Sequence, residues 1–182
     1  MARETGSITN GSYSAVHFAD TTYGLAVAAA GITAVSDDGG LTWQAGGLIA
    51  AGAAGNLCCH RIDKNKMWVG DDAGKLWYSN DGGTTWTQRI GWVGTGVGDV
   101  RAMDWVDAYI GMIVHNDAGT DGTVLMTIDG GYTWQPITVP ANDGLNACTL
   151  VSPYLAYVVG ELIAATGIAA VIKLTRAHAV GS

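Results

Sequence analysis

Three copies of one short motif recur along this 182-residue chain at a spacing that restricts its fold. The copies begin at Ser36, Ser79 and Thr127, and each follows the pattern Ser/Thr-x-Asp-Gly-Gly-x-Thr-Trp. Their tryptophans, at positions 43, 86 and 134, lie 43 and then 48 residues apart. A repeat of that length indicates one supersecondary unit that is used several times. The chain is therefore expected to be a series of similar units.

Each copy of the motif has the chemistry of a closed β-hairpin loop. Two consecutive glycines supply positive φ angles without steric cost. The Asp carboxylate and the Ser or Thr hydroxyl can accept hydrogen bonds from backbone N–H groups of the loop. The Thr-Trp that follows favours a strand, and its indole covers the end of the hairpin. We predict a structural role for Ser36, Asp38, Gly40, Thr42, Trp43, Ser79, Asp81, Gly83, Thr85, Trp86, Thr127, Asp129, Gly131, Thr133 and Trp134.

These segments resemble Asp-box repeats, the S-x-D-x-G-x-T-W signature of BNR-type β-propellers. That family includes sialidases, the sortilin luminal domain and photosystem II assembly factors, and related repeats occur in phage-encoded virion proteins. The resemblance implies that each box joins the third and fourth strands of a blade, at the periphery of the propeller and away from its central site. It covers nearly the whole chain and is specific for the fold, but a fold does not by itself define a function.

The repeat divides the chain into four expected units. Each of the first three contains three strand-like runs before the box and one after it, separated by Gly and Asp residues. No segment has a sustained helical period. We expect an all-β, propeller-like array of about four four-stranded antiparallel blades, in a single domain over residues 1–182. The blades are predicted at approximately residues 12–47, 55–92, 98–140 and 144–180.

The fourth unit has no box. Its strand-like runs at 147–150, 156–159 and 168–172 are followed by a tail, residues 176–182, without a Trp. The last blade is therefore expected to be incomplete, and proteins usually cover an unpaired sheet edge. Our hypothesis is that the segment from Thr5 to Thr9, or a neighbouring chain, supplies the missing strand. The sequence leaves three arrangements open: a closed four-bladed disc, a ring shared by several chains and an open arc.

Composition and charge narrow the classes of partner and location. The net charge of −7 and the pI near 4.7 argue against a nucleic-acid backbone or an anionic membrane as the main partner. The N-terminus has no apolar run of the kind found in secretory signals. Cys58, Cys59 and Cys148 are an odd number, which favours reduced, buried thiols over a disulfide framework. We expect synthesis in the cytoplasm without a signal peptide.

Asp boxes invite a comparison with sialidases, which resemble one another in an arginine triad, a Tyr nucleophile paired with a Glu, and an Asp acid/base. The chain has only two glutamates, Glu4 and Glu161, and no F/Y-R-I-P motif precedes the first box. We therefore predict no catalytic residues and no enzyme activity.

A metal site is a second alternative. His17, His60 and Asp104 fall at equivalent points of the first strands, about one blade apart, and Leu150 takes the fourth place. Equivalent positions of a propeller circle one axis, and two His with a carboxylate are a recognisable metal set. The simpler interpretation is that these are ordinary, partly buried residues. We predict no metal and no cofactor.

Two acidic loops and four tryptophans outside the boxes are further candidates for a ligand site. The loops at 71–74 and 116–122 carry oxygen ligands of the kind that bind Ca²⁺, but neither has EF-hand spacing, and turn chemistry explains them. Trp68, Trp77, Trp92 and Trp105 lie outside the boxes. On an exposed rim they would suit a protein or sugar interface, whereas the interior of the blades is the favoured place.

These observations favour a non-enzymatic structural or protein-binding propeller module. We expect protein partners, as a homo-oligomer or within a larger assembly such as a phage virion (head decoration, collar or tail), and neither nucleic acid nor membrane. The alternatives are an assembly-factor-like scaffold and a carbohydrate-binding, lectin-like propeller. A sialidase-type glycosidase is the least favoured.

Overall fold

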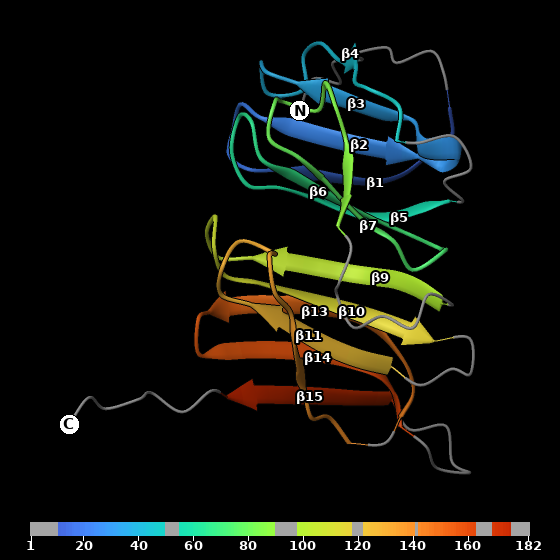
Figure 1. The fold of residues 1–182 in the computed structure, drawn as a ribbon, viewed down its shortest axis with the longest axis vertical. Coiled ribbons are helices and arrows are strands. Elements are labelled where there is room, and N and C mark those ends of the chain that lie inside the picture. The colour runs from blue at the N-terminus through green and yellow to red at the C-terminus, as the bar shows by residue number, and fades with distance from the viewer. Residues whose placement is uncertain are drawn as a thin grey trace, which may run out of the picture.

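The computed structural model describes residues 11–49, 55–89, 98–117, 122–140, 142–162 and 169–175. Within these ranges the chain forms fifteen strands in four antiparallel sheets, with one short 3₁₀ turn at Ala29–Gly31 (Figure 1). None of the described segments is a helix long and apolar enough to cross a membrane. The segment from Thr5 to Thr9, Trp92 and the tail at 176–182 lie outside the described residues.

Each sheet is one blade, and its strands follow one another in sequence order. Blade 1 consists of β1 (Tyr13–Phe18), β2 (Gly24–Ala28), β3 (Thr33–Ser36) and β4 (Gln44–Ala45). Blade 2 consists of β5 (Asn56–Arg61), β6 (Met67–Asp71), β7 (Leu76–Ser79) and β8 (Thr87–Arg89). Blade 3 consists of β9 (Gly98–Trp105), β10 (Gly111–Asp117), β11 (Gly122–Thr127) and β12 (Gln135–Ile137). Blade 4 consists of β13 (Asn142–Ser152), β14 (Leu155–Leu162) and β15 (Ala169–Thr175).

The expected propeller-like array of four blades with an incomplete last blade is confirmed. Blade 4 has three strands, and no described strand pairs with the outer edge of β15. The sequence anticipates this result because the box that leads into the fourth strand is absent there.

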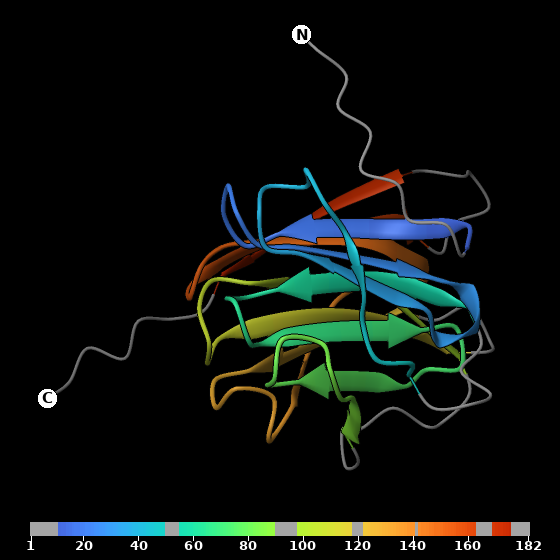
Figure 2. The ribbon, with the colours of Figure 1, turned by 90° about the horizontal axis from the view of Figure 1, so that it is seen from above.

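The blades form an open arc in the part of the chain that the structure describes. The first strands pack in succession, β1 beside β5, β5 beside β9 and β9 beside β13, so they line the inner side of the arc. Blade 1 and blade 4 lie at opposite ends of the long axis of the molecule, with blades 2 and 3 between them (Figure 1). Figure 2, which looks along that axis, shows that most of the longer strands lie roughly along one line, with neighbouring strands antiparallel.

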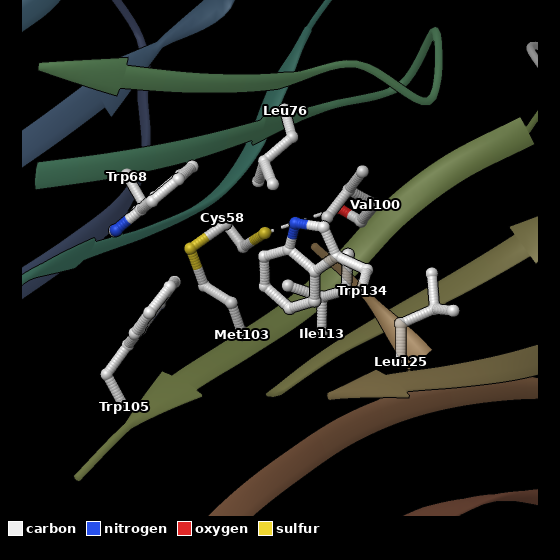
Figure 3. Close-up of a cluster of buried hydrophobic side chains, with 9 residues drawn as sticks. All are labelled: Cys58, Trp68, Leu76, Val100, Met103, Trp105, Ile113, Leu125 and Trp134. Carbon is white, nitrogen blue, oxygen red and sulfur yellow. Dashed lines mark hydrogen bonds between the residues drawn. The ribbon is translucent and has the colours of Figure 1, made fainter. Parts of the chain in front are cut away.

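Apolar side chains fill the spaces between consecutive blades. Successive residues of a strand point to opposite faces of its sheet, so an inner blade buries both faces. All five residues of β6 in blade 2 are buried, as are all five residues of β2 in blade 1. The cluster between blades 2 and 3 is drawn in Figure 3 and contains Cys58, Trp68, Leu76, Val100, Met103, Trp105, Ile113, Leu125 and Trp134. Similar clusters join blade 1 to blade 2 and blade 3 to blade 4.

Candidate functional site

The Asp boxes use their polar groups within their own loops. In the second box, the Ser79 hydroxyl donates to Asp81 at 2.8 Å and accepts from the Gly83 amide at 2.9 Å. Both the amide and the hydroxyl of Thr85 donate to the Asp81 carboxylate, at 2.9 and 2.6 Å. The other two boxes repeat this arrangement. The Thr133 hydrogen bonds lower the pKa of Asp129 to about 2. These side chains hold a loop closed and leave little capacity for a ligand.

The second glycine of a box also forms a contact between blades. Gly131 has a φ of +80°, and a Cβ added to it would lie 2.4 Å from the Trp68 ring of blade 2. Gly83 is close to Val35 of blade 1 in the same way. A box therefore closes its own hairpin and seats it against the preceding blade.

The first strands do bring His17, His60 and Asp104 together. The two imidazole rings stack with centroids 3.8 Å apart, and His60 Nδ1 lies 3.5 Å from Asp104 Oδ1. The fourth place belongs to Thr149 and not to the expected Leu150. Thr149 pairs with β14 as Asp104 pairs with β10, and its hydroxyl donates to Asp104 at 3.1 Å. Phe18 pairs with Gly24 and Leu150 with Ala156, each six positions further on, so Leu150 corresponds to Phe18 and Thr149 to His17.

This cluster joins neighbouring blades by hydrogen bonds. His17 Nδ1 accepts the Arg61 amide of blade 2 at 3.0 Å, and Asp104 accepts the Leu150 amide of blade 4 at 2.7 Å. Burial, together with the neighbouring His17, lowers the pKa of His60 to about 3, so its ring is neutral. The described residues contain no group of three His, Cys, Asp or Glu side chains arranged to hold a metal ion.

The acidic loop at 71–74 is a turn held by its own carboxylate. Asp71 is fully buried and accepts hydrogen bonds from the amides of Ala73 and Lys75 and from the Trp77 indole. In the second loop, Asn116 exchanges two hydrogen bonds with the backbone of Leu145 in blade 4, both at 2.9 Å. Residues 118–121 of that loop lie outside the described residues.

Three of the tryptophans outside the boxes are interior residues. Trp68, Trp77 and Trp105 are all buried. Trp68 and Trp105 stack across the boundary of blades 2 and 3 with ring centroids 5.0 Å apart (Figure 3). These indoles stabilise the contact between blades and are not available to a sugar or a partner.

A groove of about 560 Å³ lies between blades 3 and 4. Its lining includes Met112, Met126 and Ile128 from blade 3, and Leu150 and Leu174 from blade 4. Leu174 pairs with Ala156 of β14 as the box serine Ser79 pairs with Met67 of β6. The groove therefore lies where a fourth Asp box would pack against blade 3. Sequence reasoning missed it, and the only signal for it was the missing box.

Comparisons with known proteins agree on repeat and fold. The model of the BNR/Asp-box repeat matches residues 34–45, which contain the first box. No curated protein matches the sequence. Among solved structures, YCF48 from Cyanidioschyzon merolae is 14% identical with a TM-score of 0.66, over 96% of this chain and 55% of that one. A structure of YCF48 bound to D1 peptide is 12% identical with a TM-score of 0.44, over 82% and 60% of the two chains.

A third similar structure is the GH74 enzyme of Niastella koreensis, 24% identical with a TM-score of 0.62 over 90% of this chain and 28% of that one. The chain thus spans little more than half the length of the YCF48 structures. At these identities the likeness concerns the fold. The resemblance to Asp-box repeat β-propellers is confirmed, in its repeat by the first box and in its fold by the four blades.

Proposed function

We propose that this chain is a non-catalytic, protein-binding propeller module that takes up an extended segment of a partner protein in the groove between blades 3 and 4. The main support for this proposal is that the groove lies beside the outer edge of β15. No described strand pairs with that edge. An extended peptide that joins a sheet edge gains backbone hydrogen bonds, and neighbouring pockets select its side chains.

The complete blades indicate how long a segment could pair with the outer edge of β15. Their fourth strands are short: β4 has two residues, and β8 and β12 have three each. In blade 3, Gln135, Pro136 and Ile137 pair antiparallel with β11. A partner segment of similar length, antiparallel to β15, would complete blade 4 in the same way.

The lining of the groove suits a peptide better than a reaction. Met112 and Met126 form part of its floor, and methionine adapts to irregular apolar partners. Among the described residues of the lining only Lys173 is charged, and by strand alternation its side chain lies with Val171 on the opposite face of blade 4, so the groove favours an uncharged, apolar segment. The described residues of the lining include no Asp or Glu, whereas most glycosidases need two such residues across the scissile bond.

We further propose that the module is a subunit of a larger assembly, such as a phage virion. Its resemblance to phage-encoded proteins with the same repeat supports this setting. Synthesis in the cytoplasm is supported by the three free cysteines Cys58, Cys59 and Cys148, of which the first two are buried. An assembly-factor-like scaffold would use the same groove.

A selection from a random peptide library on the full chain tests the binding site. We expect the selected peptides to be extended and apolar, and to bind the Ile128→Asp variant at least about tenfold more weakly, because a carboxylate then faces the apolar groove. Ile128 is 55% exposed, so this variant is expected to fold. Val171→Asp, on the opposite face of blade 4, is the matched control and should bind as the parent does.

Equal binding of the peptides to both variants would contradict the site. Selected peptides that bind elsewhere on the chain would contradict it as well. Turnover of a fluorogenic sialoside would overturn the non-catalytic assignment. Copurification with phage particles tests the setting separately, since absence from purified particles removes the virion role and leaves the groove intact.

A further inference from the structure

We propose that Arg89 is the anchor of a second binding site, which binds a carboxylate group of a partner protein at the outer boundary of blades 2 and 3. This goes beyond the proposed function, because the groove lies between blades 3 and 4. Arg89 is the last residue of β8, the outer strand of blade 2, and Tyr132 belongs to the third Asp box. We call Arg89, Tyr78 and Tyr132 the Arg89 site.

The guanidinium of Arg89 is held by aromatic rings of both blades. Its Cζ lies 4.7 Å from the ring centroid of Tyr78 in blade 2 and 4.6 Å from that of Tyr132 in blade 3. The Trp68 ring is 5.7 Å away, and its stacking on Trp105 fixes it in the core (Figure 3). A cation is attracted to the face of an aromatic ring, and a guanidinium keeps its N–H donors at its edge. The rings therefore orient the cation without using its hydrogen-bond donors.

Within the described part of the chain, no carboxylate neutralises this cation. The other two arginines that the structure describes each have such a partner. Arg61 pairs with Asp37 at 2.9 Å, and Arg101 lies 2.6 Å from Asp99. Arg89 forms no ion pair or hydrogen bond with any described residue, and its buried Nε has no hydrogen-bond partner among them. A buried donor without a partner costs free energy, and a charged one costs more. The Arg89 site is therefore suited to an acceptor from another molecule.

The place of Arg89 has other residues at the two remaining boundaries between described blades. By the pairing of third and fourth strands, Gly46 of blade 1 and Ile137 of blade 3 correspond to Arg89. Beside Gly46, the Gly47 amide donates to the Gly83 carbonyl oxygen of the second box at 2.7 Å, which closes that boundary. Ile137 lines the groove. The cation is therefore particular to the boundary of blades 2 and 3, and the repeat does not explain it.

A carboxylate of a protein is the anion that fits the Arg89 site best. Because the rings lie over the guanidinium, an anion reaches it at the edge, where a planar carboxylate accepts two parallel hydrogen bonds. The net charge of −7 repels a phosphate dianion more than a single carboxylate. Tyr132 is 74% exposed beside the cation, and Tyr and Arg are enriched where protein interfaces gain most of their affinity. The group is thus an Asp or Glu side chain, or a chain end, of a partner protein.

An NMR titration of the full chain tests the chemistry of the Arg89 site. Low salt is used because salt screens an exposed ion pair. The probes are two peptides of equal size, acetyl-Gly-Glu-Gly-amide and acetyl-Gly-Gln-Gly-amide, and the readout is the amide resonances of β8 and of the third box. We expect the glutamate peptide to shift these resonances and the glutamine peptide to bind at least about tenfold more weakly, since it lacks the charge. Arg89→Lys keeps a positive charge but loses the paired donors, and should weaken binding of the glutamate peptide by about fivefold or more.

Two substitutions of Tyr132 separate recognition from a structural role. Tyr132→Leu removes a ring from the guanidinium and should weaken binding by about threefold or more, whereas Tyr132→Phe keeps the ring and should bind as the parent does. Since Tyr132 is 74% exposed, both variants are expected to fold, which urea denaturation establishes. Arg101→Lys is the matched control for Arg89→Lys, because Arg101 is already paired with Asp99, and it should leave binding unchanged.

Equal affinity for the two peptides would overturn the proposal, as would unchanged affinity in Arg89→Lys. Inorganic phosphate is a third probe, and tighter binding of phosphate than of the glutamate peptide would overturn the choice of a carboxylate. A Tyr132→Leu variant that loses stability but not affinity would mean that the Arg89 site only holds the two blades together. The groove variant Ile128→Asp should bind the glutamate peptide as the parent does, so this test and the peptide selection fail independently.

Discussion

Arg61 is the residue that joins blades 1 and 2 most extensively by polar contacts. Its guanidinium is buried and donates to the carbonyl oxygens of Gly24 and Ser36 at 2.6 and 2.9 Å and to the Asp37 carboxylate at 2.9 Å. At the equivalent place blade 3 has Trp105. One interface of the arc is thus held by hydrogen bonds where the next is held by stacked rings.

Removal of this side chain is expected to destabilise the protein strongly. Arg61→Ala should lower the free energy of unfolding by about 3 kcal/mol, because two buried carbonyl oxygens lose their donor. Urea denaturation of the full chain measures the change. Arg101→Ala is the control, since Arg101 is half-exposed in its pair with Asp99 and should cost less than about 1 kcal/mol. Equal losses in the two variants would show that the burial of Arg61 does not matter.

His60 makes stability depend on pH in a defined direction. Burial lowers its pKa from 6.5 to about 3, so the folded state binds a proton less readily than the unfolded state. Stability is therefore greatest above pH 6.5 and falls as the pH drops from 6.5 toward 3. His60→Gln should make the free energy of unfolding less dependent on pH in that window. Urea denaturation at several pH values measures it, and an unchanged slope would contradict the assignment.

The residue scale also shows where sequence reasoning succeeded and failed. The repeat period placed His17, His60 and Asp104 on one inner line, and they do lie together. It gave Leu150 as the fourth member, whereas the pairing of β13 with β14 puts Thr149 there. The turns after the first strands of blades 1 to 3 contain Asp20, Asp63 and Asp107, whereas blade 4 has no Asp there to fix the count. The role of Arg61 had no signal either, because burial of one arginine depends on the neighbouring blade.

At the scale of elements, the box is the part of the molecule that its sequence describes best. The hydrogen bonds of its Ser, Asp and Thr side chains within the loop join residues no more than four positions apart, so local chemistry suffices to specify them. The first glycine of each box also donates its amide to the turn after the first strand, as Gly82 does to Asn65. The groove, in contrast, depends on contacts between residues far apart in the sequence. It is formed by blades 3 and 4 together, and the sequence indicates it only by the absence of a fourth box.

The packing of a box against the preceding blade can be tested with two neighbouring glycines. Gly130 and Gly131 both have positive φ, +74° and +80°, so alanine is strained at either position. Only at Gly131 would the new Cβ also meet the Trp68 ring, at 2.4 Å. We expect Gly131→Ala to lose about 1–3 kcal/mol more stability than Gly130→Ala, in line with overpacking of a core. Equal losses in thermal or urea unfolding would mean that the contact with blade 2 is unimportant.

At the scale of the whole molecule, the open arc was one of three arrangements that the sequence left undecided. Box spacing gives the number of blades, because each box ends one blade. The angle between blades depends on the volume of the side chains between them, such as the stacked Trp68 and Trp105. That volume comes from pairs of residues far apart in the sequence, which no local pattern reveals.

An open arc should be least stable at its ends. Each blade contacts only its neighbours, as in a repeat protein, so blades 1 and 4 have one supporting interface where blades 2 and 3 have two. Hydrogen exchange tracks local opening of this kind. We expect the amides of β1 and β15 to exchange faster than those of β6 and β10 in a dilute sample of the full chain. Exchange at β1 and β15 that is no faster than at β6 and β10 would show that one supporting interface stabilises a blade as well as two do.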